Sequence, residues 1–225
     1  MPLFNDELHP ISSTIAFIEN DINTITSELI AWQNPLINKF NNTLQSKVIN
    51  EDLKKTMLSL CPLTTIEKRR YLLIPTKSKW TAFFDNGHMG TDRTAPEVLG
   101  EKLNSKVIYI SFDTIEEENV FDYYDLIDGD YGLKRAISVT KESKWEFNQY
   151  GNALSFEDIE KYKLRTIKER FTIDMLNNYL KEFSIDIFNE DFYNTLDGSM
   201  LINKIGPKFK DTRELSLQDT KEFFK

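Results

Sequence analysis

The chain has 225 residues, of which 28 are Lys or Arg and 36 are Asp or Glu, giving a formal net charge of −8. Its length and its aromatic content of 12% indicate a folded protein with a buried core and exclude an intrinsically disordered one. The negative charge excludes nucleic acid as the expected partner, because binding to a phosphate backbone depends on Lys and Arg.

No apolar run approaches the roughly 20 residues needed to cross a bilayer. The first seven residues have neither the basic region nor the apolar region of a secretory signal. The single cysteine, Cys61, cannot form a disulfide within the chain. We therefore expect a cytoplasmic protein that has no membrane partner.

Apolar side chains between residues 11 and 32 recur at alternating spacings of four and three (Ile11, Ile15, Ile18, Ile22, Ile25, Leu29 and Trp32). This heptad-like pattern predicts one long amphipathic helix that packs on its own chain. A coiled-coil dimer is the alternative, and a monomer is expected ahead of it. Two further helices are expected at residues 36–48 and 51–60, so that residues 10–62 are predicted to be helical.

Residues 70–151 predict about six mainly antiparallel strands and one inserted helix. The strands are expected where β-branched and aromatic side chains gather, at residues 71–74, 80–84, 106–112, 121–127, 135–140 and 144–150. The inserted helix is expected at residues 94–104, where Pro96 suits the first turn and apolar residues follow at helical spacing.

After the sheet, residues 155–197 predict further helices, one opening at Ser155, one capped by Thr172 and a short one around Phe188, Phe192 and Tyr193. From residue 198 the periodicity fades, and residues 198–225 are predicted to be a charged tail. The sequence shows no repeat and no long linker. The expected fold is therefore a single α+β domain over residues 1–225, with helices before and after a central antiparallel sheet.

The loop Asp85-Asn86-Gly87-His88-Met89-Gly90-Thr91-Asp92 allows two interpretations. Asp85, His88 and Asp92 could act as a general base or ligate a metal, as in a carboxylate- or metal-dependent hydrolase. The spacing matches no known ligand motif, so we favour a structural loop. In that interpretation Asp85 accepts hydrogen bonds from its own turn, Gly87 or Gly90 takes a positive φ, and Asp92 or Thr94 caps the following helix. We expect no catalytic residue, metal or cofactor.

A second feature is a window from Val107 to Leu133 that contains eight acidic residues and no Lys or Arg. It is either a solvated face of the sheet or a surface that binds a basic protein. Tyrosines within the window favour an interface, because aromatic residues are enriched there. The expected binding residues are Glu116, Glu117, Glu118, Asp122, Tyr123, Tyr124, Asp125 and Tyr131.

No family motif can be matched residue by residue. The order of the expected elements, together with the net acidity, resembles small bacterial toxin-immunity proteins. This resemblance implies a non-enzymatic protein that holds a basic partner, of which a toxin would be one example. The expected function is therefore a protein-binding module, and the hydrolase is the alternative.

Overall fold

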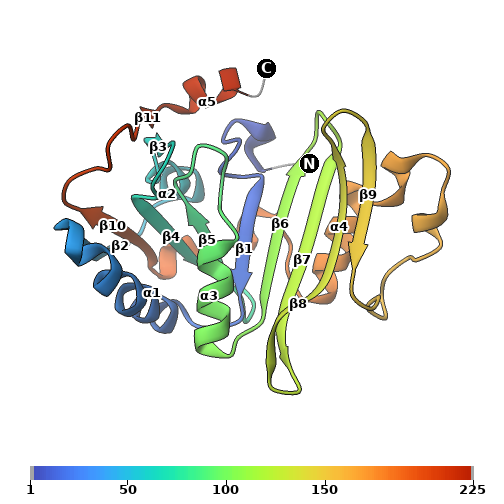
Figure 1. Ribbon diagram of the computed structural model, residues 1–225, viewed down its shortest axis with the longest axis horizontal. Helices are drawn as coiled ribbons and strands as arrows, with labels where there is room; N and C mark the ends of the chain where they lie inside the picture. Colours follow the sequence, from blue (N-terminus) through green and yellow to red (C-terminus); the bar gives the residue numbers. More distant parts are fainter. Residues whose placement is uncertain (1–2, 224–225) are drawn as a thin grey trace.

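The computed structural model describes residues 3–223, in which nine antiparallel strands form one sheet with helices on both faces (Figure 1). The strand order is β2-β10-β4-β5-β1-β6-β7-β8-β9, and a separate pair is formed by β11 and β3. The strands are β1 (Thr14–Ile18), β2 (Thr43–Ile49), β3 (Leu63–Thr64), β4 (Arg70–Pro75), β5 (Thr81–Asp85), β6 (Val107–Asp113), β7 (Glu118–Ile127), β8 (Asp130–Lys141), β9 (Trp145–Tyr150), β10 (Ser199–Ile205) and β11 (Glu214–Leu215).

The helices divide between the two faces of the sheet. They are α1 (Ile22–Ile37), α2 (Leu53–Leu58), α3 (Thr94–Leu103), α4 (Ile173–Glu182) and α5 (Leu217–Phe223). One core cluster joins α1 and α3 to the face seen in Figure 1, through side chains such as Leu29 and Leu99. The other joins α2 and α4 to the opposite face, through Met57 and Leu180. The sheet is thus buried on both sides, as burial of its apolar area requires.

The α+β class is confirmed, and so are the six predicted strands, which form β4 to β9. β4 pairs with β5, and β6 to β9 pair successively as a meander. The inserted helix is α3, as expected. The sheet is larger than predicted because three strands lie in segments that were predicted to be helix or tail.

The predicted helix at residues 11–32 is wrong in its first half, because residues 14–18 form β1 at the centre of the sheet. β1 pairs with β5 on one side and with β6 on the other, and all five of its residues are buried. A strand buried on both faces is a continuous apolar run, which periodicity alone cannot distinguish from a helix. The helix α1 begins only after Asp21, whose side chain accepts hydrogen bonds from the N–H groups of Asn23 and Thr24.

The predicted helix at residues 36–48 is also wrong. α1 continues to Ile37, a short 3₁₀ turn follows, and Asn41 takes a left-handed conformation with a φ of 57° before β2. The predicted tail is wrong at residues 199–205, which form β10 between β2 and β4. These pairings join residues far apart in the chain, so no local pattern predicts them.

The C-terminal helices are confirmed in part. α4 is present with Thr172 as its N-cap, whereas residues 155–170 contain no α-helix and only the 3₁₀ turns Lys161–Lys163 and Ile167–Arg170. The short helix expected near Phe192 is the 3₁₀ turn Glu190–Phe192. Across residues 3–223, no helix has the length and apolar character that crossing a bilayer requires.

Candidate functional site

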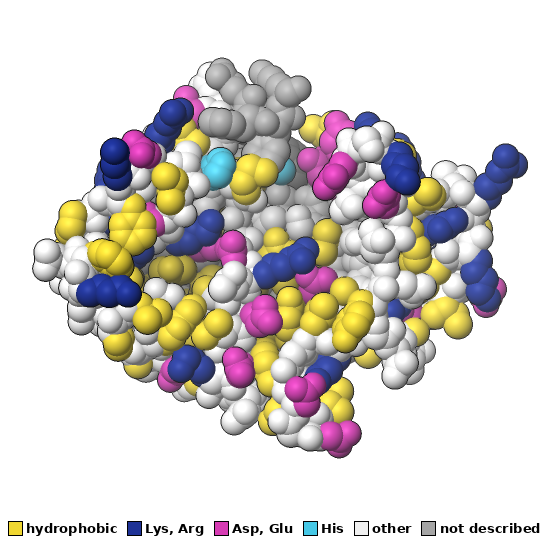
Figure 2. All heavy atoms as spheres, viewed as in Figure 1, with side chains coloured by type: hydrophobic (Ala, Val, Ile, Leu, Met, Phe, Trp, Pro, Cys, Tyr) yellow, Lys and Arg dark blue, Asp and Glu magenta, His cyan; other side chains and the backbone are white. Residues whose placement is uncertain are grey.

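The antiparallel sheet separates the residues of the acidic window. β6 and β7 meet at a turn formed by residues 113–118, and β7 and β8 meet at a second turn at the opposite end of β7 (Figure 1). A ten-residue strand such as β7 spans about 30 Å. Figure 2 correspondingly shows acidic side chains scattered over one face of the molecule, with Lys and Arg between them. The eight acids therefore do not form one continuous patch.

The tyrosines of the window are not brought onto that surface either. Tyr123 and Tyr124 are adjacent on a strand and point to opposite faces, where each is buried in a different core cluster. The hydroxyl of Tyr123 donates a hydrogen bond of 2.5 Å to Asp125. Tyr131 is half-buried, and its hydroxyl lies close to the backbone of Gly100 on α3. Tyr124 and Tyr131 therefore pack on the face covered by α3, and Tyr123 packs on the opposite face against Phe183.

Asp122 is buried at 4% exposure on β7, in contact with Arg93. Its carboxylate lies 3.2 Å from Nε of Arg93, whose guanidinium group is 4.9 Å from the ring centroid of Tyr109. Burial raises the pKa of Asp122 to about 6, while Arg93 acts in the opposite direction and Glu97 adds to the rise. This acid is therefore held inside the protein and cannot meet a partner directly.

The loop after β5 has the structural arrangement that the sequence favoured. The side chain of Asp85 is buried and accepts hydrogen bonds from the N–H groups of Gly87, at 2.8 Å, and Asp92, at 2.9 Å. Burial raises the pKa of Asp85 to about 6, against the attraction of Lys68. Gly90 takes a φ of 85° where a Cβ atom would collide with Thr14, and Asp92 accepts a hydrogen bond from the N–H group of Thr94 at the start of α3.

A hollow of about 390 Å³ lies beside this loop and is lined by Lys68, Asp92, Arg93 and Tyr109 among others. Neither Asp85 nor His88 lines it. Within residues 3–223, no group of three or more His, Cys, Asp and Glu side chains is arranged to hold a metal ion. The three residues of the hydrolase alternative are therefore near in sequence, but they do not converge on a space that a substrate could occupy.

The turn of residues 113–118, here called the acidic turn, presents a different combination of groups. Ile115 is 84% exposed at its tip. Oδ1 of Asp113 accepts hydrogen bonds of 2.8 Å from the N–H groups of Ile115 and Glu116, and Glu117 takes a φ of 61°. Glu117 also forms an ion pair with Lys168. The turn is thus fixed in shape while its side chains remain accessible.

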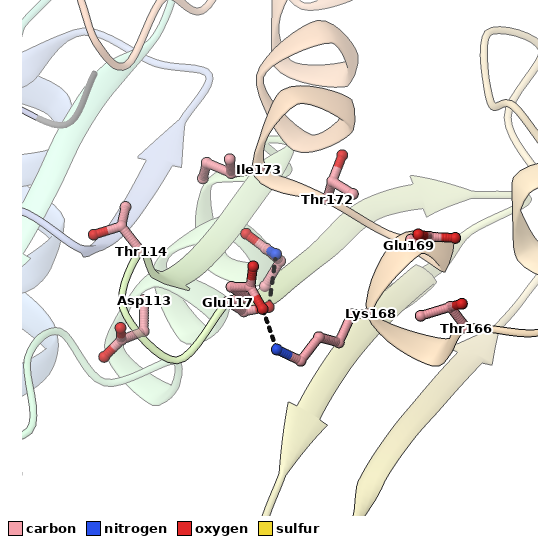
Figure 3. A pocket seen from close by; sticks show the side chains of 9 residues that line it. Asp113, Thr114, Glu117, Thr166, Lys168, Glu169, Thr172 and Ile173 are labelled. Carbon is pink, nitrogen blue, oxygen red and sulfur yellow. Dashed lines mark hydrogen bonds and ion pairs between the residues drawn. The ribbon is translucent and has the colours of Figure 1, made fainter.

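A cavity of about 420 Å³ lies between the acidic turn and the start of α4 (Figure 3). We call it the turn cavity. Asp113, Thr114, Glu117 and Asn119 line one side of it, and residues between Thr166 and Ile173 line the other. Figure 3 shows Lys168 reaching across from the 3₁₀ turn toward Glu117. The cavity therefore joins the acidic turn to a segment some fifty residues later in the chain.

Most residues of this region were not among the expected binding residues, and they include Asp113, Ile115, Asn119 and Lys168. Ile115 could have been found from the sequence, because it is an apolar residue between Asp113 and the three consecutive glutamates 116–118. Asn119 lies just before the strand predicted at residues 121–127, and Lys168 lies in a basic segment predicted to be helical. Their proximity depends on tertiary folding.

No protein-family model matches this sequence, and comparisons with curated proteins and with solved structures give no match either. The function is therefore inferred from the side chains of this chain alone.

Proposed function

We propose that this protein is a non-enzymatic binding module that holds a basic protein through the acidic turn. The observation that carries the proposal is the exposure of Ile115, which exceeds that of any other large hydrophobic side chain described. Asp113, Glu116, Glu117 and Glu118 lie around it on the same turn. An apolar anchor within a charged rim is the usual arrangement of an interface.

The rigidity of the acidic turn supports this role. The hydrogen bonds of Asp113 fix the backbone, so association costs little ordering of the turn. Glu116 and Glu117 form ion pairs with Lys141 and Lys168, and the side chains of these pairs are between 43% and 58% exposed. Ion pairs this exposed contribute little stability, so a cationic partner can replace them at small cost.

The charge of the chain supports a basic partner. A net charge of −8 attracts a cationic protein over distances of about one Debye length and raises the rate of encounter. A bacterial toxin is one member of this class, in line with the resemblance in the order of elements. The hydrolase alternative has less support, because the buried Asp85 has no exposed surface with which to meet a substrate.

The proposal is tested by comparing two triple variants of equal chemistry. Ile115→Ser, Glu116→Lys and Glu117→Lys alter the acidic turn. Ile127→Ser, Asp128→Lys and Asp130→Lys make the same change at the opposite end of β7, where all three residues are also exposed. Proteins captured from the native host by the unaltered chain and by each variant are quantified by mass spectrometry, and the captured partner is then expressed for kinetic measurement.

We expect the acidic-turn variant to lose the partner while the control variant retains it. The affinity should fall at least about tenfold, because an anchor and two rim charges are removed together. Association should slow several-fold at low salt, and the difference should shrink as salt is added. Equal capture by the two variants would exclude the acidic turn as the interface. A captured partner without a basic surface would contradict the proposed class of partner.

A further inference from the structure

The turn cavity contains a buried acceptor without a donor. Asn119 is 2% exposed and lines the cavity, and its Oδ1 atom has no hydrogen-bond partner. Its Nδ2 atom donates to the carbonyl oxygens of Glu117, at 3.3 Å, and Phe171, at 3.2 Å. Two carbonyl acceptors fix which end of the amide is the nitrogen, since the flipped amide would place oxygen against oxygen. A buried acceptor of this kind is costly unless a donor reaches it.

The charges around the cavity define the kind of donor. Asp113, Glu117 and Glu169 contribute carboxylates to the lining, against the single ammonium group of Lys168. Because Oδ1 of Asp113 already accepts two backbone hydrogen bonds, its Oδ2 atom is the one left for a ligand. Carboxylate and amide oxygens together call for a cationic group with several N–H donors.

The N-terminus of α4 does not turn the cavity into an anion site. The side chain of Thr172 already accepts a hydrogen bond from the N–H group of Met175, and Asp174 places a carboxylate in the first turn of the helix. The cap occupies a free N–H group that an anion would need, and the carboxylate offsets the positive end of the helix dipole. Three carboxylates in the lining would also repel an anion.

We propose that the turn cavity is a site for a guanidinium group, namely an arginine side chain of the basic partner. Guanidinium has five donors in a planar fork, so it bonds an amide oxygen and a carboxylate together in a way that a single ammonium group cannot. The volume of about 420 Å³ is within the range of small-ligand sites. This inference rests on the proposed function and specifies which partner side chain it recognises.

Lys168 competes with the arginine for Glu117 in this arrangement. Its ammonium group forms an ion pair with the carboxylate from the far side of the cavity (Figure 3). The arriving guanidinium therefore has to displace an existing ion pair. Removal of Lys168 should strengthen binding, whereas removal of the charge on Glu117 should weaken it, and a structural role for these residues would not produce opposite signs.

The experiment uses the full chain and N-acetyl-arginine methylamide, followed by NMR. Its citrulline counterpart, which has the same shape without the charge, is the comparison ligand. We expect the arginine compound to shift the side-chain amide signals of Asn119, and the citrulline compound to bind at least about threefold more weakly. Lys168→Met should increase the affinity about threefold, and Glu117→Gln should reduce it by a similar factor.

Lys106→Met is the control for Lys168→Met, because Lys106 has a side-chain exposure of 40%, close to the 43% of Lys168, and pairs with Asp125 near the other end of β7. Equal effects of the two variants, or no shift at Asn119, would overturn the proposal and leave a water molecule as the donor. If the acidic-turn variant still loses the basic protein while the arginine compound does not bind, the proposed function stands and this inference fails. Binding of the arginine compound without that loss would reject the proposed function instead.

Discussion

At the scale of single residues, the buried carboxylates show which electrostatic effect dominates. Arg93 lies 3.2 Å from Asp122, and an exposed pair of this kind would lower the pKa of the acid. The pKa of Asp122 is nevertheless raised to about 6, because the loss of hydration outweighs the attraction to a half-exposed guanidinium group. The ionised form of Asp122 therefore lowers the stability of the fold at neutral pH.

Because desolvation outweighs the attraction of Arg93, Asp122→Asn should change how the free energy of unfolding depends on pH. A carboxyl group whose pKa is raised from 3.8 to about 6 binds its proton more tightly in the folded state, so its contribution to the free energy of unfolding falls as pH rises from about 4 to 6. The asparagine amide does not titrate, so the variant lacks this pH-dependent contribution. We expect the free energy of unfolding of the variant, relative to the unaltered chain, to increase across that range by at most about 3 kcal/mol.

The measurement is denaturant unfolding at a series of pH values. Asp128→Asn, at an exposed position on the turn between β7 and β8, supplies the baseline for a carboxylate-to-amide change. Asp85 has a similarly raised pKa and is unaltered in both variants, so its contribution cancels. A relative stability that falls with rising pH would show that the attraction of Arg93 dominates after all.

At the scale of elements, the sequence predicted those strands and helices whose signals are local. β4 to β9 carry β-branched and aromatic runs bounded by turns, and α3 and α4 have a proline or a cap at the start. β1 was missed because a fully buried strand has no period of two, and β2 and β10 were missed because each depends on the other. The buried ion pair between Arg135 and Glu157, at 2.6 Å, likewise joins a strand to an irregular segment with no sequence signal.

The edge strand β2 has a specific arrangement of unpaired groups. The N–H group of Lys204 on β10 donates a hydrogen bond to the carbonyl oxygen of Arg69, so the backbone N–H and C=O groups of Lys204 face β4. They therefore point away from Leu44, the residue opposite Lys204 on β2. By alternation, Leu44, Ser46 and Val48 direct their N–H and C=O groups to the open side. The side-chain Oδ1 atom of Asn34 on α1 already accepts a hydrogen bond of 2.8 Å from the N–H group of Leu44.

These features oppose pairing of β2 with a second copy of the chain. One antiparallel register sets Ser46 opposite Ser46 and needs the N–H group of Leu44, which Asn34 occupies. The next register sets Ser46 opposite Val48 and brings the two Lys47 side chains face to face. Like charges directly opposite each other destabilise a strand pair, and Lys is a common protection of exposed edges.

We therefore expect Lys47→Val to promote self-association through β2. The variant should sediment as a mixture of monomer and dimer whose proportions change with protein concentration, whereas the unaltered chain should sediment as a monomer. Lys47→Gln removes the charge without adding a β-branched apolar side chain, so it should associate less than Lys47→Val. Monomeric behaviour of Lys47→Val would show that Lys47 does not protect the edge, and a dimer of the unaltered chain would show that the edge is used for assembly.

At the scale of the whole molecule, the sheet is assembled from segments of the chain in an order unlike the sequence. β10, from near the C-terminal end, lies between β2 and β4 and pairs with both. Ile202 on β10 is fully buried in the core cluster that also contains Leu29 of α1. Residues 199–205, expected to be part of a tail, therefore form an inner strand of one half of the sheet.

Truncation tests this placement. A chain that ends at residue 198 loses β10, which leaves β2 without a strand to pair with and exposes the edge of β4. It also exposes Leu73 and the other core side chains that belong to the same cluster as Ile202. Because β10 is hydrogen-bonded to a strand on each side, its removal breaks both sets of backbone hydrogen bonds. We therefore expect this chain to be unfolded or aggregated, as judged by circular dichroism and amide NMR dispersion. A chain that ends at residue 216 keeps β10 and β11 and loses only α5, so it should retain the dispersion of the full chain. A folded chain ending at residue 198 would contradict the strand order and restore the tail that the sequence predicted.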